Sequence, residues 1–174
     1  IRMPRVIMGG LVGAVLAVAG AGYQGVFRNP LADPYLLGVA AGAGLGATAV
    51  IGTNAGPAAI PIVAFIGGLA AVGATYFLSR TVGGRTTTSL VLAGVAVAAF
   101  ATAIQTFLLQ RNYETLHEVY SWILGRLVTV GWGEVRSLIP YAVVASAAIV
   151  ALRRLLDVLG LGDEEASGLG VNVI

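Results

Sequence analysis

The chain has 174 residues, of which 57% are hydrophobic and 10% charged, and its mean hydropathy is +0.90. Soluble domains carry about 25% charged residues, so this composition argues against a soluble enzyme. The absence of cysteine excludes disulfides and cysteine-ligated metal sites, and a net charge of +2 without a basic run gives no basis for nucleic-acid binding.

Uncharged runs recur along the whole chain and predict an all-α bundle of transmembrane helices. About 20 helical residues, each rising 1.5 Å, cross the ~30 Å of bilayer hydrocarbon. The apolar runs are continuous rather than alternating, which favours helices over the strands of a barrel. Five spans are predicted, in chain order: residues 6–27, 36–53, 60–78, 89–109 and 137–152.

Glycines recur at four-residue spacing in the first two predicted spans: Gly9 and Gly13, then Gly38, Gly42 and Gly46. Such rows let two helix backbones approach closely in lipid. Packing within one bundle is the favoured interpretation, and a dedicated dimer seam is the alternative.

Nucleotide binding by this chain is not expected. Residues 42–47 (GAGLGA) match a dinucleotide fingerprint, but no acidic residue follows about 20 positions later. The chain has no lysine, which a phosphate-binding Walker loop requires. If ATP drives this protein, another subunit binds it.

The single histidine lies between two acids, as Glu114, His117 and Glu118. A carboxylate-bridged metal site would need two Glu-x-x-His pairs and further glutamates, and the chain has one such pair. A solvated surface is therefore the favoured interpretation, with no catalytic or metal site. A membrane enzyme that uses these three residues is kept as an alternative.

Aromatic residues gather after the fourth predicted span and indicate a membrane–water interface. They are Tyr113, Tyr120, Trp122 and Trp132. Residues 123–130 are too short to span the bilayer and are predicted to form an interfacial or re-entrant helix. Residues 161–170 read as a short helix with acids in its first turn or, from the residues alone, as a polar loop.

Four segments resemble signatures of one family, the FecCD-like permeases of type II ABC importers, which take up iron–siderophores, heme and vitamin B12. The order and spacing agree over all 174 residues. The segments are residues 1–5 (IRMPR), 28–34 (RNPLADP) followed by 36–39 (LLGV), 90–96 (LVLAGVA) and 161–171 (LGDEEASGLGV).

The resemblance implies a topology that charge alone does not give, because the arginines divide equally between the two sides. Such permeases have about ten spans, so this chain would run from about the second span to a cytoplasmic coupling helix. Residues 28–35, 79–88 and 153 onward would be cytoplasmic, and Arg2, Arg5 and residues 110–136 periplasmic.

The resemblance also implies roles for particular residues. Arg2 and Arg5 would dock the binding protein, whose carboxylates suit guanidinium groups. Asn29, Thr87 and Thr88 would narrow the cytoplasmic end of the pathway. The coupling helix that meets the ATPase would comprise Gly162, Asp163, Glu164, Glu165, Ala166, Ser167, Gly168, Leu169 and Gly170.

The implied protein is a non-enzymatic, multi-pass permease of the bacterial inner membrane. Its partners would be a second permease copy, two ATP-binding cassette subunits that hold ATP and Mg, a periplasmic binding protein and the bilayer. The cargo expected is an iron–siderophore chelate, with heme or cobalamin as alternatives. A membrane-assembly subunit is a further alternative. Tyr35 departs from the family's usual glycine, and Ala40-Ala41 from its more polar pair.

Overall fold

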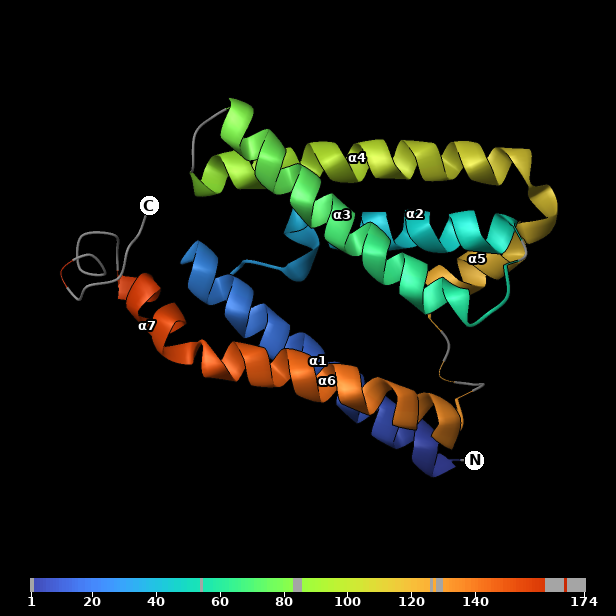
Figure 1. Cartoon of the computed structure of the whole chain (residues 1–174), viewed down its shortest axis with the longest axis horizontal. Coiled ribbons are helices and arrows are strands. Elements are labelled where there is room, and N and C mark those ends of the chain that lie inside the picture. The colour runs from blue at the N-terminus through green and yellow to red at the C-terminus, as the bar shows by residue number, and fades with distance from the viewer. Residues whose placement is uncertain are drawn as a thin grey trace. The chain divides into compact units, whose positions relative to one another are not determined.

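The computed structural model describes residues 2–53, 55–82, 86–125, 127, 130–161 and 168. All regular structure in these ranges is helical, which confirms the all-α prediction. The α-helices are labelled in Figure 1, and the elements in chain order are α1 (Arg2–Phe27), η1 (Pro34–Leu37), α2 (Val39–Gly52), α3 (Ala59–Val82), α4 (Thr87–Arg111), η2 (Tyr113–Thr115), α5 (Leu116–Ile123), α6 (Trp132–Ala151) and α7 (Arg153–Leu161).

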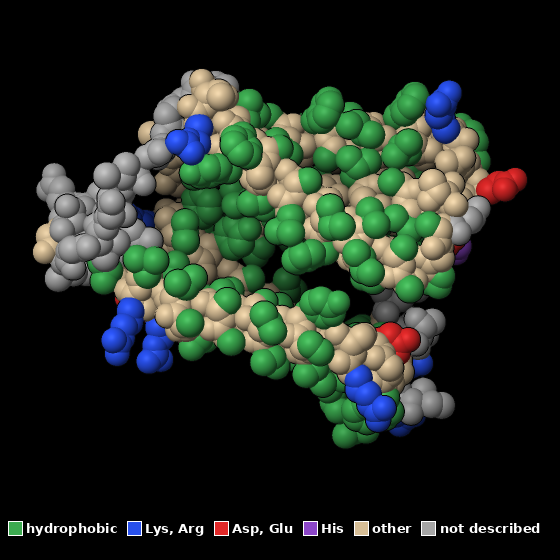
Figure 2. All heavy atoms as spheres, in the orientation of Figure 1, with side chains coloured by type: hydrophobic (Ala, Val, Ile, Leu, Met, Phe, Trp, Pro, Cys, Tyr) green, Lys and Arg blue, Asp and Glu red, His purple; other side chains and the backbone are tan. Residues whose placement is uncertain are grey.

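Four of the described helices, α1, α3, α4 and α6, are long and apolar enough to cross a membrane. Large apolar side chains remain exposed along them, including Phe65, Phe77 and Phe100. Figure 2 shows apolar side chains spread over the lengths of the helices, with charged groups near their ends. Contiguous apolar surface of this extent is costly in water and suits a lipid surrounding.

The chain divides into two compact units, residues 1–34 with 126–174 and residues 35–125. In the first unit, α1 packs along α6 and meets α7 near its own C-terminal end. Gly22 and Gly25 of α1 face these helices: a Cβ atom at Gly22 would lie 3.8 Å from Ile149 and one at Gly25 would lie 3.7 Å from Leu156, which are ordinary van der Waals contacts.

In the second unit, α2 packs against both α3 and α4. Its crossing with α3 depends on glycine, because a Cβ atom at Gly46 would lie 2.5 Å from the carbonyl oxygen of Val63. A Cβ atom at Gly42 would similarly lie 2.6 Å from the Cβ atom of Ala71. Gly42 and Gly46 therefore pack within the bundle, as expected, whereas no described atom lies within 4 Å of a Cβ atom at Gly13.

The second predicted span differs from the structure. Residues 36–53 are not one helix, because η1 ends at Leu37 and Gly38 adopts a left-handed φ of 73° before α2 begins. Gly38 is held against α4, where a Cβ atom would lie 3.3 Å from the carbonyl oxygen of Gly94. The remaining 14-residue helix is only about 21 Å long at 1.5 Å per residue.

The elements around the aromatic cluster also differ from the prediction. The short helix is α5, which ends at Ile123, and the described residues after it, 124, 125, 127 and 130, are not helical, so the prediction of a helix over residues 123–130 is wrong. Gly125, with a φ of 71°, follows α5. The next helix, α6, begins five residues before residue 137, because Glu134 caps it by accepting a 2.9 Å hydrogen bond from the Gly131 backbone N–H.

Candidate functional site

The two N-terminal arginines lie in the first turn of α1. Pro4 is buried between them, where its fixed φ suits a helix start. Arg2 is exposed and Arg5 half-buried. Their three-residue spacing places both on one side of the helix. The exposed guanidinium group of Arg2 can receive a carboxylate of a partner by paired hydrogen bonds.

Asn29 forms a turn after α1 and is exposed. Its side-chain oxygen accepts a 2.9 Å hydrogen bond from the Leu31 backbone N–H, and Gln24 Nε2 donates to the carbonyl oxygen of Pro30 at 3.0 Å. The preceding Arg28 has a positive φ of 49°. Asn29, expected in the pathway, is therefore also a local determinant of the turn.

Thr87 and Thr88 are exposed in the first turn of α4. The residue that caps this helix is Thr86, whose hydroxyl oxygen accepts a 3.1 Å hydrogen bond from the Ser89 backbone N–H. Thr87 and Thr88 belong to the second unit, whereas Asn29 belongs to the first. The expected coupling segment, residues 162–170, lies outside the described residues except for Gly168, which is exposed.

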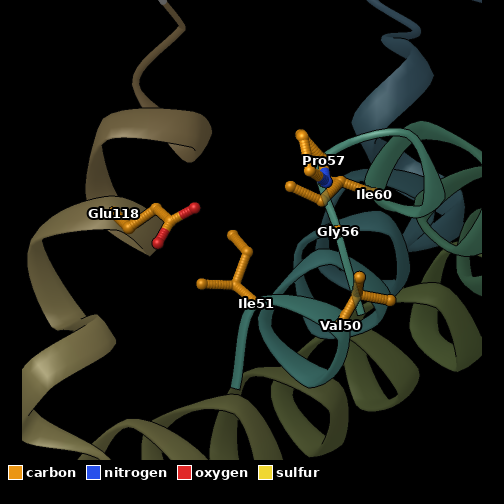
Figure 3. Close-up of a pocket in the computed structure, with 6 residues that line it drawn as sticks. All are labelled: Val50, Ile51, Gly56, Pro57, Ile60 and Glu118. Atoms are coloured by element: carbon orange, nitrogen blue, oxygen red, sulfur yellow. The ribbon is translucent and has the colours of Figure 1, made fainter. Parts of the chain in front are cut away.

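The three residues of the enzyme alternative do not share a cavity. A hollow of about 250 Å³ lies beside α5, and Glu118 of α5 faces Ile51 of α2 across it (Figure 3). Apart from Glu118, the hollow is lined by Val50, Ile51, Gly56, Pro57 and Ile60. Glu114 and His117 are exposed outside it, and the described residues contain no cluster of three metal-ligating side chains. Within the described part of the chain, these three side chains therefore do not converge on one site.

A larger trough of about 480 Å³ runs along α4 and was not anticipated from the sequence. Gly94, Ala98 and Thr102 line it at four-residue spacing, so they lie on one helix face. Tyr35 and Leu36 contribute from η1. The four-residue row of small residues in α4 is the signal that could have revealed the trough.

A family model, described as the FecCD transport family, matches residues 1–174. The chain belongs to this family. With four apolar helices of spanning length, it is a multi-pass membrane protein.

The names of curated relatives of this chain refer to three kinds of cargo. A cobalamin import system permease protein of Halobacterium salinarum is 39% identical over 177 residues, which cover 99% of this chain and 47% of the relative. An Fe(3+)-citrate import system permease protein of Bacillus subtilis is 38% identical, covering 99% and 52%. A hemin transport system permease protein of Yersinia pestis is 37% identical, covering 99% and 54%. The chain therefore spans about half the length of these relatives.

A solved structure agrees with the fold. It shows an inward-facing conformation of a protein assigned to the metal-chelate type of ABC transporter, and superposes with a TM-score of 0.88 at 26% identity. The match covers 99% of this chain and 56% of that one. The membership in the FecCD family thus rests on both sequence and structure.

Proposed function

We propose that this chain forms part of the permease of an ABC importer that moves an iron–siderophore-type chelate across the bacterial inner membrane. The observation that carries the proposal is the match of the whole chain to import permeases, combined with apolar helices of spanning length. The similarity to a metal-chelate type transporter supports the cargo class. Heme and cobalamin remain the alternatives, since relatives bear those names too.

The trough on α4 is our candidate for one wall of the pathway. The small side chains that line it offer room for a bulky cargo, and the hydroxyl group of Thr102 offers a hydrogen bond to a chelate's oxygen atoms. Tyrosine also ligates heme iron in some proteins, which keeps heme among the cargoes to be tested.

Energy would come from two separate ATPase subunits, because this chain has no lysine for a Walker loop. A second permease copy would complete the pathway. A periplasmic binding protein would dock at Arg2 and Arg5, and the ATPase at residues 162–170. Asn29, Thr87 and Thr88 would narrow the cytoplasmic end. This chain itself would bind neither ATP nor a metal cofactor.

The proposal is tested by uptake in cells that carry the full-length protein with its ATPase and binding protein. We expect accumulation of a ⁵⁵Fe-labelled siderophore, and none when the ATPase carries an inactivated Walker lysine. Parallel arms supply labelled heme and cobalamin. Preference for either would replace the cargo within the same function, and accumulation that continues without an active ATPase would contradict the importer itself.

A further inference from the structure

A groove of about 300 Å³ lies in the first unit, between the C-terminal half of α1, the end of α6 and α7. Its walls are mainly apolar, and the rim contributed by α7 carries Arg153 and Asp157. At ~30 Å³ per water molecule, this volume corresponds to about ten waters. The groove thus has room for part of a long, flexible apolar chain.

Glycine keeps the groove open. Gly22 and Gly25 of α1 line it, and a Cβ atom at either position would make only ordinary contacts, 3.8 Å to Ile149 and 3.7 Å to Leu156. The backbones are therefore close without clashing. The space that larger side chains would occupy is left as an apolar recess.

The two charged residues face this recess together. Arg153 and Asp157 are four residues apart on α7, so they lie on the same side, about 5–6 Å apart at Cβ. Both are exposed, and among the described residues neither has a hydrogen-bond or ion-pair partner. A cation and an anion, separated by one helical turn, are thus both available to a ligand.

The position of the groove points to a membrane lipid. It continues from the apolar end of α6, a helix of spanning length, to the charged start of α7. In α7, Leu155 and Leu156 lie between the charged residues Arg154 and Asp157, and Leu155 is 41% exposed, as in amphipathic helices that lie at the headgroup level. The walls would meet acyl chains and the rim would meet headgroups.

We propose that this groove binds phosphatidylethanolamine, with an acyl chain along the apolar wall, the phosphate at Arg153 and the ammonium group at Asp157. Arginine pairs with phosphate through two parallel N–H groups, and a carboxylate accepts hydrogen bonds from the ammonium group. Phosphatidylglycerol has no cation to offer Asp157, and the quaternary ammonium of phosphatidylcholine has no N–H donor. The proposal requires only that the chain lies in a membrane, so it goes beyond the proposed transport function and does not depend on it.

The test uses the full-length protein, purified in detergent and titrated with phosphatidylethanolamine, phosphatidylglycerol or phosphatidylcholine of identical acyl chains. Native mass spectrometry counts the bound lipids. We expect Arg153→Ala to weaken phosphatidylethanolamine binding about fivefold, the effect of one interfacial arginine on a phosphate. Arg154→Ala is the matched control, because Arg154 is exposed but does not line the groove; its effect should stay within about twofold.

Two further variants separate the parts of the site. Asp157→Asn should abolish the preference for phosphatidylethanolamine over phosphatidylcholine. Ala21→Phe, which fills the groove from an exposed position of α1 and keeps both charges, should weaken binding of phosphatidylethanolamine as Arg153→Ala does. Size-exclusion profiles confirm that each variant is folded. Stronger binding of phosphatidylglycerol than of phosphatidylethanolamine, or equal losses in Arg153→Ala and Arg154→Ala, would overturn the proposal.

Discussion

Asn29 has a structural role in a turn, and we propose a transport role for the same side chain. Its oxygen holds the turn after α1 by accepting the hydrogen bond from the Leu31 backbone N–H. Its amide NH₂ group, in contrast, is the part that could meet a passing cargo. Aspartate preserves the first feature and removes the second, whereas alanine removes both.

We therefore predict different outcomes for two substitutions at this residue. Asn29→Ala should lower the free energy of unfolding by about 1 kcal/mol, because the hydrogen bond to the turn is lost. It should also lower uptake. Asn29→Asp should restore stability. Uptake that recovers fully with Asn29→Asp would indicate a turn-forming role alone, and uptake that stays low would support a role in the pathway. Melting temperature and ⁵⁵Fe uptake of the full-length variants give the two measurements.

Arg2 and Arg5 carry a second prediction at this scale. Reversing both charges, by Arg2→Glu with Arg5→Glu, should weaken binding of the cognate binding protein by about tenfold or more, because like charges then face each other across the interface. Affinity of the purified full-length complex is measured at low and high salt, and the difference should shrink at high salt.

The matched control for this charge reversal is Arg136→Glu. Arg136 is exposed in the first turns of α6. It belongs to the segment that is expected on the same side of the membrane as Arg2 and Arg5. Its reversal tests whether net charge alone weakens binding. Equal losses in the control and in the double variant would refute specific docking at Arg2 and Arg5.

The crossing of α2 and α3 should be sensitive to added volume. A Cβ atom at Gly67 would collide with the backbone carbonyl oxygen of Gly42, and backbone cannot move aside as a side chain can. Gly67→Ala should lower the free energy of unfolding by about 1–3 kcal/mol. Denaturation of the full-length protein in mixed micelles measures the change.

Gly73→Ala in the same helix is the control, because no described atom lies within 4 Å of a Cβ atom there. Its effect should stay within about 0.5 kcal/mol. If both substitutions were neutral, close glycine packing would not stabilise this crossing. If both were equally harmful, the cost would come from altered helix geometry and not from the contact with Gly42.

The helices that were predicted well from the sequence are those whose position along the chain follows from hydropathy alone. Long uncharged runs correspond to α1, α3 and α4, since the energetic cost of burying charge in lipid leaves a clear signal. The start of α6 was missed because Glu134 and Arg136 interrupt the uncharged run, although a helix end at the headgroups tolerates charges. The helix α5 was misplaced although Leu116, Val119 and Ile123 recur at helical spacing.

The break before α2 and the trough on α4 depend on tertiary contacts that no local pattern carries. Gly38 adopts a positive φ where η1 meets α4, and that meeting joins segments more than 50 residues apart in sequence. The small residues of α4 were visible in the sequence, but their exposure in a trough was not. Roles of individual residues came from the family resemblance and not from the pattern of the chain.

For the whole molecule, the number of times that the chain crosses the membrane decides on which side each proposed site lies. If the four long helices cross and η1 with α2 crosses once more, Arg2 and Arg5 lie on one side. Asn29, the connection from α3 to α4, and the chain after α6 then lie on the other side. This division agrees with docking on one face and ATP coupling on the opposite one, so the two functions should be separable by mutation.

Residues 162–170 give the test of that separation. Replacing Asp163, Glu164 and Glu165 by serine should leave affinity for the binding protein within about twofold of the unmodified transporter, because docking lies on the opposite face. Transport per ATP hydrolysed should fall by roughly tenfold, a typical size for a lost coupling between sites. Both are measured on the full-length transporter reconstituted with its ATPase in vesicles. A loss of docking with coupling intact would place the acidic segment on the periplasmic side and would contradict the proposed topology. The segment could lie on that side only if the number of membrane crossings before it were even and not five.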